Sequence, residues 1–228
     1  MSEDRAENGA SSAEAPPDCA RCQRLADFLA LQRDREPTWF NRPVPSFGEA
    51  SARLLIVGLA PGLKGANRTG RPFTGDYAGD LLYSTLSVFN FSTGVFAARP
   101  DDGLKLIDCM ITNAVRCVPP ENKPTPAEIK ACRTFLSARI AALPNLRAIV
   151  CLGRISHEST LSALGEKRSH FPFGHGTHHR IRATLSVFDS YHCSRYNTNT
   201  GVLTPEMFRA VFADVRRHLD GGSTKSKA

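Results

Sequence analysis

Four short apolar segments, each followed by a polar turn that carries Gly, Asn or His, constrain the fold of this chain most strongly. Their length and composition are typical of buried β-strands, and we predict strands over residues 53–58, 106–115, 147–153 and 184–191. Helical patterns, several of which open with Pro or Thr, alternate with them over residues 79–89, 126–143, 154–164 and 205–219. This alternation predicts an α/β fold in which helices cover both faces of a parallel sheet and all four strands end at one edge.

Length and composition predict one domain. The chain has 228 residues, of which 41% are hydrophobic, and this is enough to bury a single sizeable core. Both ends are small, polar or charged, so we expect disordered tails over residues 1–17 and 220–228 and one domain over residues 18–219. No apolar run reaches 18 residues and no signal peptide pattern is present, so we expect a cytoplasmic protein without a membrane role.

The loop from Gly58 to Asp80, GLAPGLKGANRTGRPFTGDYAGD, has the composition of a ligand pocket rather than of a simple connection. It directly follows the first apolar segment, and its carboxylates come only at Asp76 and Asp80. Loops that leave the carboxyl ends of parallel strands are where α/β folds bind ligands. Asn113 ends the second segment and His192 follows the last one, so both should reach the same edge. Taken alone, His192 is more typical of a structural histidine, but its expected position beside Asn113 and the Gly58 loop favours a functional role.

The spacing of four cysteines indicates a metal centre. Cys19 and Cys22 form a C-x-x-C pair with polar neighbours, and Cys117 and Cys132 flank the Pro-rich segment VPPENKPTPAEIKA. Four soft thiolates suit an iron-sulfur cluster or zinc, and the lack of a second close pair favours the cluster. The alternative is that all seven cysteines are core residues. Because seven is an odd number, the cysteine count argues against a disulfide framework.

Other cysteines and histidines receive simpler interpretations. Cys109 and Cys151 lie within apolar segments and fit the core, and Cys193 fits a small, partly exposed residue. The histidines of the Gly-rich stretch FGHGTHH are interpreted as part of a surface loop, because no further ligand lies at a spacing suited to a metal.

Charge adds a weak indication of a polyanionic partner. The formal net charge is +7 and the pI is near 9.2, values that many proteins without such a partner share. The placement of the charges is more informative, because Arg68 and Arg71 lie inside the Gly58 loop and Arg195 lies in the loop after the last strand.

The motifs GLAPG, GANRTGRPFTGD, TNAVRC and YHCSRYNTNTGVLT, in this order and spacing, resemble the uracil-DNA glycosylase superfamily. The resemblance is to family 5, the type B iron-sulfur enzymes of prokaryotes, and it covers roughly residues 19 to 207. It implies a three-layer αβα sandwich around a central, mainly parallel four-stranded sheet. It further implies a structural [4Fe-4S] cluster held by Cys19, Cys22, Cys117 and Cys132.

The resemblance implies a monofunctional glycosylase that flips uracil out of DNA and excises it. Phe73 resembles the ring on which the base stacks, and Asn113 resembles the amide that reads the edge of the base. His192 would stabilise the leaving base, and Asp76 would orient water or balance the sugar cation. Phe73 as a core aromatic and Asp76 as a helix cap are the structural alternatives. The full expected set is base-binding Gly58, Leu59, Ala60, Phe73 and Asn113, with Asp76, Asn113 and His192 catalytic.

The sequence departs from related branches where they place a water-activating acid. Family 4 carries Glu and family 1 carries Asp at positions that correspond here to Leu59 and Ala60. Because both positions are apolar here, Asp76 becomes the stronger candidate for the acidic group that activates water. Loss of a strong base often accompanies a broader substrate choice, so we expect uracil, with hypoxanthine and other deaminated bases as further substrates.

The loop Ser194 to Thr200 is expected to engage DNA. Tyr196 would wedge into the gap that the flipped base leaves, although a surface tyrosine is an equal alternative, and Arg195 would meet a phosphate. The expected DNA-binding residues are Arg68, Arg71, Ser194, Arg195, Tyr196 and Asn197. We expect a monomer at the nucleoid that acts on double-stranded and also single-stranded DNA.

Two functions of other classes remain open from the sequence. A protein that binds uracil in DNA without cleaving would keep Phe73 and Asn113, and the apolar Leu59 and Ala60 are compatible with it. An iron-sulfur redox sensor would explain the cysteines but not the tight backbone motifs around Gly58.

Overall fold

A computed structural model describes residues 13–221, so most of each expected tail lies outside the described residues. The expected N-terminal boundary at residue 18 is too late. Ala13 is fully buried, and the Glu14 carboxylate lies 2.6 Å from Arg139 and 3.3 Å from Arg116. The chain therefore packs from residue 13 onward because a buried ion-pair network holds it.

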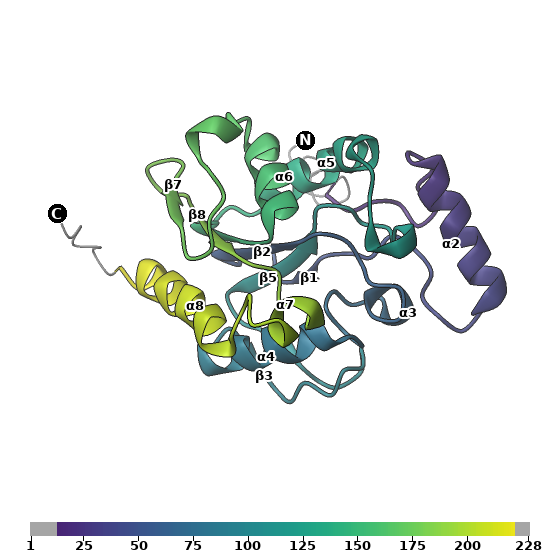
Figure 1. The fold of residues 1–228 in the computed structure, drawn as a ribbon, viewed down its shortest axis with the longest axis horizontal. Coiled ribbons are helices and arrows are strands. Elements are labelled where there is room, and N and C mark those ends of the chain that lie inside the picture. Colours follow the sequence, from purple (N-terminus) through teal and green to yellow (C-terminus); the bar gives the residue numbers. More distant parts are fainter. Residues whose placement is uncertain (1–12, 222–228) are drawn as a thin grey trace, which may run out of the picture.

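A mixed sheet forms the centre of the molecule (Figure 1). Its strands run in the order β1-β5-β2-β6-β8-β7, and the middle four are parallel. These four are β5 (Cys109–Asn113), β2 (Leu54–Gly58), β6 (Ala148–Leu152) and β8 (Ser186–Ser190). They confirm the predicted mainly parallel core. Short antiparallel strands that the sequence did not reveal, β1 (Phe47–Gly48) and β7 (His178–Arg180), complete the two edges.

Two layers of helices cover the sheet and confirm the three-layer sandwich (Figure 1). Successive strand residues point to opposite faces, so Leu54 and Ile56 pack in one core cluster while Leu55 and Val57 pack in another. The first cluster contains side chains of α4 (Tyr77–Val88) and α8 (Pro205–Leu219), and the second those of α5 (Pro126–Ala141) and α6 (Arg154–Leu164).

Local sequence explains where two of these helices begin. Thr125 accepts a hydrogen bond from the Glu128 amide while the Glu128 carboxylate accepts one from the Thr125 amide, and Pro126 occupies the first turn. This reciprocal capping satisfies amides that the helix leaves free. Thr204 and Pro205 repeat the Thr-Pro start at α8.

Several elements differ from the sequence prediction. The segment 106–115 is not one strand, because Lys105–Leu106 (β4) pairs with Ser92–Thr93 (β3) and the chain turns at Asp108, where φ is 55°. The loop Ser194–Thr200 contains a short helix, α7 (Arg195–Asn199). Further elements are α2 (Gln23–Arg35), α3 (Ala66–Thr69) and the 3-10 turns Pro120–Asn122 and Arg168–His170.

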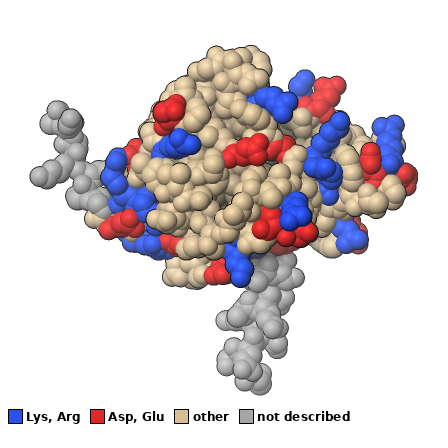
Figure 2. Space-filling view, turned by 90° about the horizontal axis from the view of Figure 1, so that it is seen from below, with Lys and Arg blue, Asp and Glu red and all other residues tan. Residues whose placement is uncertain are grey.

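Charged side chains of both signs are interspersed on the face covered by α4 and α8 (Figure 2). The net charge of +7 is therefore not concentrated on this face. None of the helices between residues 13 and 221 combines the length and the apolar character that a bilayer crossing requires.

Candidate functional site

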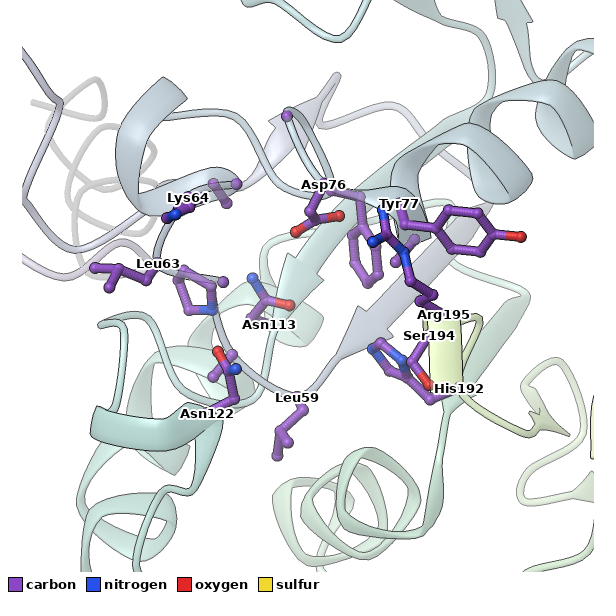
Figure 3. A pocket seen from close by; sticks show the side chains of 18 residues that line it. Leu59, Leu63, Lys64, Asp76, Tyr77, Asn113, Asn122, His192, Ser194 and Arg195 are labelled. Atoms are coloured by element: carbon purple, nitrogen blue, oxygen red, sulfur yellow. The ribbon is translucent and has the colours of Figure 1, made fainter. Parts of the chain in front are cut away.

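An open pocket of about 730 Å³ lies where the chain leaves β2, β5 and β8 (Figure 3). The predicted convergence of the loops after these strands is therefore confirmed. The predicted residues that line the pocket are Leu59, Ala60, Phe73, Asp76, Asn113, His192, Ser194 and Arg195. Figure 3 shows Asp76, Asn113 and His192 approaching the pocket from three different elements.

Phe73 is held in a strained backbone conformation at the inner wall. Its φ is 53°, in the left-handed region that costs a non-glycine residue about 1–2 kcal/mol. The carbonyl group of Phe73 approaches α4 so closely that any side chain at Gly79 would overlap it. The Phe73 ring lies 6.0 Å from the His192 ring, at an interplanar angle of 30°. The two rings therefore form neighbouring walls of the pocket.

Asn113 places the oxygen of its side-chain amide, free of a partner within the described residues, at the pocket. It is the last residue of β5, lies opposite Gly58 of β2, and is 3% exposed. Within residues 13–221 its Oδ1 atom is buried without a hydrogen-bond partner, which is costly unless a ligand or water supplies one. Gly58 makes this arrangement possible, because a Cβ there would overlap Asn113 Oδ1 and lie 2.7 Å from the Phe73 ring.

Asp76 lines the pocket from the N-cap position of α4. Among residues 13–221 its Oδ1 is buried without a hydrogen-bond partner, while the amides of Ala78 and Gly79 in the first turn of α4 lie close enough to the carboxylate to lower its pKa. A Cβ at Gly62 would lie 3.0 Å from Asp76 Oδ2, and a Cβ at Gly65 would lie 2.8 Å from Asp76 Cγ. The two glycines therefore leave room for the carboxylate. Burial raises the Asp76 pKa, although the amides of α4 act in the opposite direction. The carboxylate is therefore a stronger proton acceptor than an ordinary Asp.

His192 is a neutral side chain at physiological pH. Burial lowers the pKa of His192 to about 4, because the imidazolium form loses hydration. The Nδ2 of Asn197 donates a hydrogen bond of 2.8 Å to the His192 carbonyl oxygen. The donating group of Asn197, predicted to meet DNA, is thus engaged in holding His192. A neutral imidazole N–H can donate a hydrogen bond to negative charge that develops on a ligand.

The predicted DNA-binding assignment of Arg71 is wrong. Its side chain is 6% exposed, and its guanidinium forms a two-point ion pair with the carboxylate of Asp102, at 2.8 and 2.7 Å. The rings of Phe47, Tyr83 and Phe96 surround it, at 5.3, 5.6 and 5.7 Å from the guanidinium carbon. Arg71 therefore fixes the loop that carries Phe73 and cannot reach a ligand.

The other predicted DNA contacts lie at the surface. Arg68 is exposed, and Tyr196 is 74% exposed. Arg195 stacks its guanidinium over the Tyr77 ring at 5.2 Å, across the mouth of the pocket. Ser194 caps α7 by accepting a hydrogen bond from the Asn197 amide. Contact with DNA stays a prediction for these residues.

Three polar pocket residues were missed from the sequence: Lys64, Tyr77 and Asn122. Lys64 lies within the predicted pocket loop, so the loop composition could have revealed it. Tyr77 directly follows Asp76. Asn122 comes from the Pro-rich segment between the cysteines, where its φ of 58° turns the chain toward the pocket, and no sequence signal placed it there.

The four predicted metal ligands gather around one small cavity. Cys19, Cys22, Cys117 and Cys132 line it together with apolar side chains such as Leu25. Burial raises the pKa of Cys22, Cys117 and Cys132, in the case of Cys132 to about 11. A metal must therefore displace their protons when it binds.

The environment of the cysteines is tied to the surrounding fold. The amide of Arg116 donates to the Cys132 sulfur at 3.3 Å. The guanidinium of Arg116 is buried, donates to Ser46 Oγ at 2.9 Å and to the Ala13 carbonyl oxygen at 3.1 Å, and pairs with Glu14. The buried Arg116 cation interacts with the Cys132 and Cys117 thiols, which is electrostatically suited to the thiolate form that a metal would bind.

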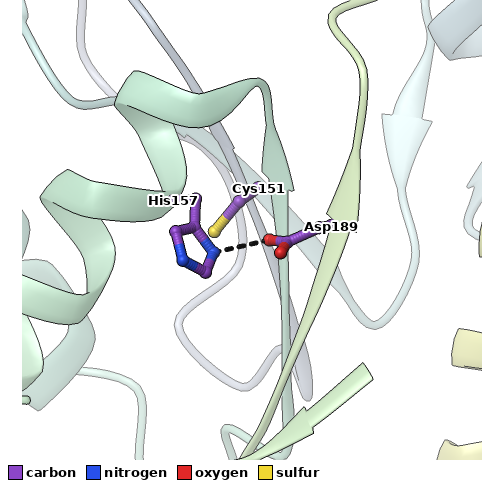
Figure 4. A group of neighbouring side chains, drawn as sticks. All are labelled: Cys151, His157 and Asp189. Carbon is purple, nitrogen blue, oxygen red and sulfur yellow. Dashed lines mark hydrogen bonds and ion pairs between the residues drawn. The ribbon is translucent and has the colours of Figure 1, made fainter. Parts of the chain in front are cut away.

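A second group of metal-ligating side chains, Cys151, His157 and Asp189, is fully buried between β6, α6 and β8 (Figure 4). His157 Nδ1 lies 2.7 Å from Asp189 Oδ1, and His157 Nε2 lies 2.8 Å from the Phe171 carbonyl oxygen. Burial alone would lower the His157 pKa, but the hydrogen bond to Asp189, the negative charge of Asp189 and the hydrogen bond to the Phe171 carbonyl together outweigh it, and the pKa is raised. Both ring nitrogens are thus occupied, which favours a structural hydrogen-bond network over a metal site.

A profile of the uracil DNA glycosylase superfamily matches residues 45–216. The chain is 47% identical over 205 residues to a type-5 uracil-DNA glycosylase of Thermus thermophilus, covering 87% of this chain and 93% of that protein. It is 38% identical over 197 residues to a type-5 uracil-DNA glycosylase of Pyrobaculum aerophilum, covering 85% of both. A type-4 uracil-DNA glycosylase of the same organism matches at 36% identity over 125 residues, 54% of this chain and 56% of that protein.

Proposed function

Because the chain belongs to the uracil DNA glycosylase superfamily, we propose that it is a monofunctional DNA N-glycosylase of the type-5 class that flips uracil out of DNA and excises it. The observation that carries this proposal is the pair of buried, unpaired oxygens, Asn113 Oδ1 and Asp76 Oδ1, in a pocket walled by the Phe73 ring. Unpaired buried polar atoms in an open pocket are what a polar planar ligand would satisfy.

Binding of the base uses three features of the pocket. The base stacks on Phe73, and the side-chain amide of Asn113 pairs with the uracil edge, because an amide can accept from N3–H and donate to O4. Leu59 and Ala60, which line the pocket, add apolar contacts and no competing charge. A base extruded from the duplex would replace the missing hydrogen-bond partner of Asn113.

Cleavage breaks the bond between the sugar C1′ and N1 of the base, and the electron pair leaves with the base. The N–H of the neutral His192 imidazole donates a hydrogen bond to the anion that forms. The low pKa of His192 keeps the ring neutral at physiological pH, so the ring does not have to lose a proton first. The Asp76 carboxylate balances the sugar cation, then accepts a proton from the water whose oxygen bonds to C1′. The released base takes its proton from solvent.

The four cysteines hold a [4Fe-4S] cluster in this proposal. The four cysteines line one cavity, and only Cys19 and Cys22 form a close pair in the sequence, whereas a zinc site built from two such pairs is the common pattern. The cluster would tie α2 to the end of β5 and to α5, a structural role that requires no electron transfer.

The exposed residues Arg68, Arg195 and Tyr196 engage the DNA around the flipped nucleotide. The arginines would contact phosphates and Tyr196 would fill the gap in the duplex. Action on chromosomal DNA would place a monomeric enzyme at the nucleoid in the cytoplasm. Hypoxanthine and other deaminated bases are further substrates in this proposal, because no acidic side chain at position 59 or 60 restricts the pocket.

The test is excision from a labelled duplex that contains one U:G pair, with and without hot alkali after the reaction. We expect multiple turnovers that yield abasic sites cleaved only by alkali. Asp76→Asn and Asn113→Ala should each lose most of the activity, whereas Asp101→Asn, at an exposed carboxylate, should retain it. Strand cleavage without alkali would implicate the pocket amine of Lys64 in a lyase step and contradict monofunctional chemistry.

Tight binding that depends on uracil, without abasic sites, would favour the damage-binding alternative. In that case the unpaired Asp76 oxygen would have no catalytic explanation. A duplex with one hypoxanthine tests the broader substrate range in the same assay.

A further inference from the structure

The segment from Phe171 to His179, which joins α6 to β7, packs against the end of β8 next to His192. His175 in this segment accepts a hydrogen bond at Nδ1 from the Tyr191 amide, at 3.1 Å. Its ring also stacks on the Tyr191 ring, with centroids 4.9 Å apart and an interplanar angle of 20°. Tyr191 directly precedes His192, so His175 contacts the chain one residue before the pocket histidine.

A buried carboxylate anchors the segment that carries His175. Asp189 is fully buried, and its two oxygens lie 2.7 Å from His157 Nδ1 and 3.2 Å from His179 Nε2. Its main chain makes two further hydrogen bonds to the segment, with Thr177 at 2.9 Å and Gly176 at 2.8 Å. These contacts fix the segment on β8, so that His175 meets Tyr191 from a rigid support.

The hydrogen bond requires a particular form of His175. Nδ1 must carry a lone pair in order to accept from an amide, so the proton of the neutral ring lies on Nε2. Burial lowers the His175 pKa and so favours this neutral form, although the main chain of Met207 acts in the opposite direction. The acceptor role is therefore consistent with the environment of the ring.

Three successive residues at the end of β8 are held by three separate elements. The Gly153 amide donates to the Ser190 carbonyl oxygen at 2.8 Å, His175 accepts from the Tyr191 amide, and Asn197 donates to the His192 carbonyl oxygen. We propose that His175 is a positioning residue that sets the backbone of His192, and through it the direction of the His192 imidazole in the pocket.

This inference rests on the proposed glycosylase function for its catalytic consequence. The imidazole stabilises the leaving base only if its N–H points at the oxygen that gains charge, and a displacement of about 1 Å can cost about 100-fold in rate. Loss of the His175 acceptor should therefore slow the chemical step and leave DNA binding intact.

Two substitutions separate the hydrogen bond from the stacking. His175→Phe keeps a ring against Tyr191 and removes the acceptor, whereas His175→Asn keeps an acceptor oxygen close to the Nδ1 position and removes the ring. We expect His175→Phe to lower the single-turnover excision rate about 10- to 100-fold at saturating enzyme, with an unchanged Kd for uracil-containing DNA. His175→Asn should remain within about threefold of the parent, and His170→Phe, at an exposed histidine five residues away, should have no effect.

A second readout does not depend on activity. The pKa of His192, followed by NMR, should rise from about 4 toward its ordinary value in His175→Phe and stay low in His175→Asn, because a displaced ring gains hydration. A parent protein that excises no uracil would overturn the proposed function, while the NMR comparison would still decide the positioning role. Equal rates and equal His192 pKa values in the parent and His175→Phe would overturn the inference. So would equal losses in His175→Phe and His175→Asn. If His175→Phe does not fold, a slow but folded His175→Asn overturns the inference and an active one supports it.

Discussion

Arg71, in the loop from Gly58 to Asp80, and Asp102 meet in a buried two-point ion pair, with Nη1–Oδ1 and Nη2–Oδ2 distances of 2.8 and 2.7 Å. The guanidinium holds the pKa of the Asp102 carboxyl well below its usual range. The Nε of Arg71 also donates to Thr74 Oγ1 at 2.8 Å. The Arg71 guanidinium therefore links both ends of the four-residue segment 71–74, in which Phe73 adopts its strained conformation, and the ion pair holds it to Asp102.

Arg71→Met should lower the free energy of unfolding by about 3–5 kcal/mol, because it leaves the Asp102 carboxylate buried without its cation. Urea or thermal unfolding measures this change. Arg68→Met is the matched control in the same loop: Arg68 is exposed, so its stability should change by less than about 0.5 kcal/mol. Arg68→Met should instead weaken DNA binding and reduce its salt dependence by about one charge. A stable Arg71→Met variant would contradict the structural role of the ion pair.

Gly58→Ala should abolish base recognition while the sheet stays folded. The added methyl group would overlap Asn113 Oδ1 and press on the Phe73 ring, so the amide and the ring could not both keep their positions. We expect the excision rate to fall about 100-fold. In the Asn113→Ala background, the same substitution should cost much less, because its main target is gone. Additive losses in the double variant would show that Gly58 acts by another route.

The pH dependence of excision should follow Asp76 rather than His192. The Asp76 pKa is raised above 3.8 by burial and the catalytic form is the carboxylate, so the rate should rise as pH increases through that pKa. His192 is already neutral above about pH 4, so no inflection is expected near 6.5. A single-turnover pH profile measures both features. An inflection of the rate near pH 6.5 that disappears in His192→Gln would instead indicate that the protonated imidazolium takes part in catalysis.

Asp76 should also reduce the stability of the folded protein at neutral pH. Its folded-state pKa lies above the unfolded value of 3.8, so the folded state holds the proton more tightly. Its contribution to stability is present below pH 3.8 and is lost as pH rises through the folded pKa. Asp76→Asn should therefore raise the free energy of unfolding at pH 7 by about 0.5–2 kcal/mol while it removes activity. An unchanged or lower stability at pH 7 would show that burial of the Asp76 carboxylate carries no cost.

The central strands could be predicted from the sequence because a short apolar run that ends in a polar turn is typical of a buried strand. It did not reveal β1 and β7, which are two and three residues long and lie at the edges of the sheet. Arg68 and Arg71 look equivalent in the sequence, and only the position of Asp102, which lies 31 residues further along the chain, separates an exposed arginine from a buried one. Long-range pairing of this kind leaves no local signal.

The site was predictable where it depended on strand ends and less so where it depended on packing. Asn113 and His192 were found because each follows a parallel strand, and parallel strands end at one edge. Asn122 was missed because its approach to the pocket depends on two consecutive residues with positive φ, Glu121 and Asn122, in a segment without glycine. His175 was placed in an unremarkable loop because its partner, the Tyr191 amide, is a backbone group.

Cys117→Ala should remove the proposed cluster. We expect loss of visible absorbance and of bound iron and sulfide, together with weaker attachment of the segment around Cys19, which shares the cavity. Cys109→Ala is the matched control, because Cys109 is equally buried but lies in the core beside Leu54 and not at the cavity. Iron that persists in Cys117→Ala, or is lost equally in Cys109→Ala, would contradict the ligand assignment. Zinc in place of iron would contradict the proposed cluster.

Tyr196→Ala should separate duplex from single-stranded substrates. Tyr196 lies on α7, four residues after His192, and is 74% exposed, so its ring is not packed in the hydrophobic core. If the ring fills the gap left by the flipped base, its removal should cost about 1–3 kcal/mol, or about 5- to 150-fold, in duplex excision. Single-stranded DNA has no gap to fill, so its excision rate should change by less than about threefold. Tyr196→Phe should keep the duplex rate, because stacking requires the ring and not the hydroxyl. Equal losses on both substrates would instead indicate a general contact with the DNA backbone.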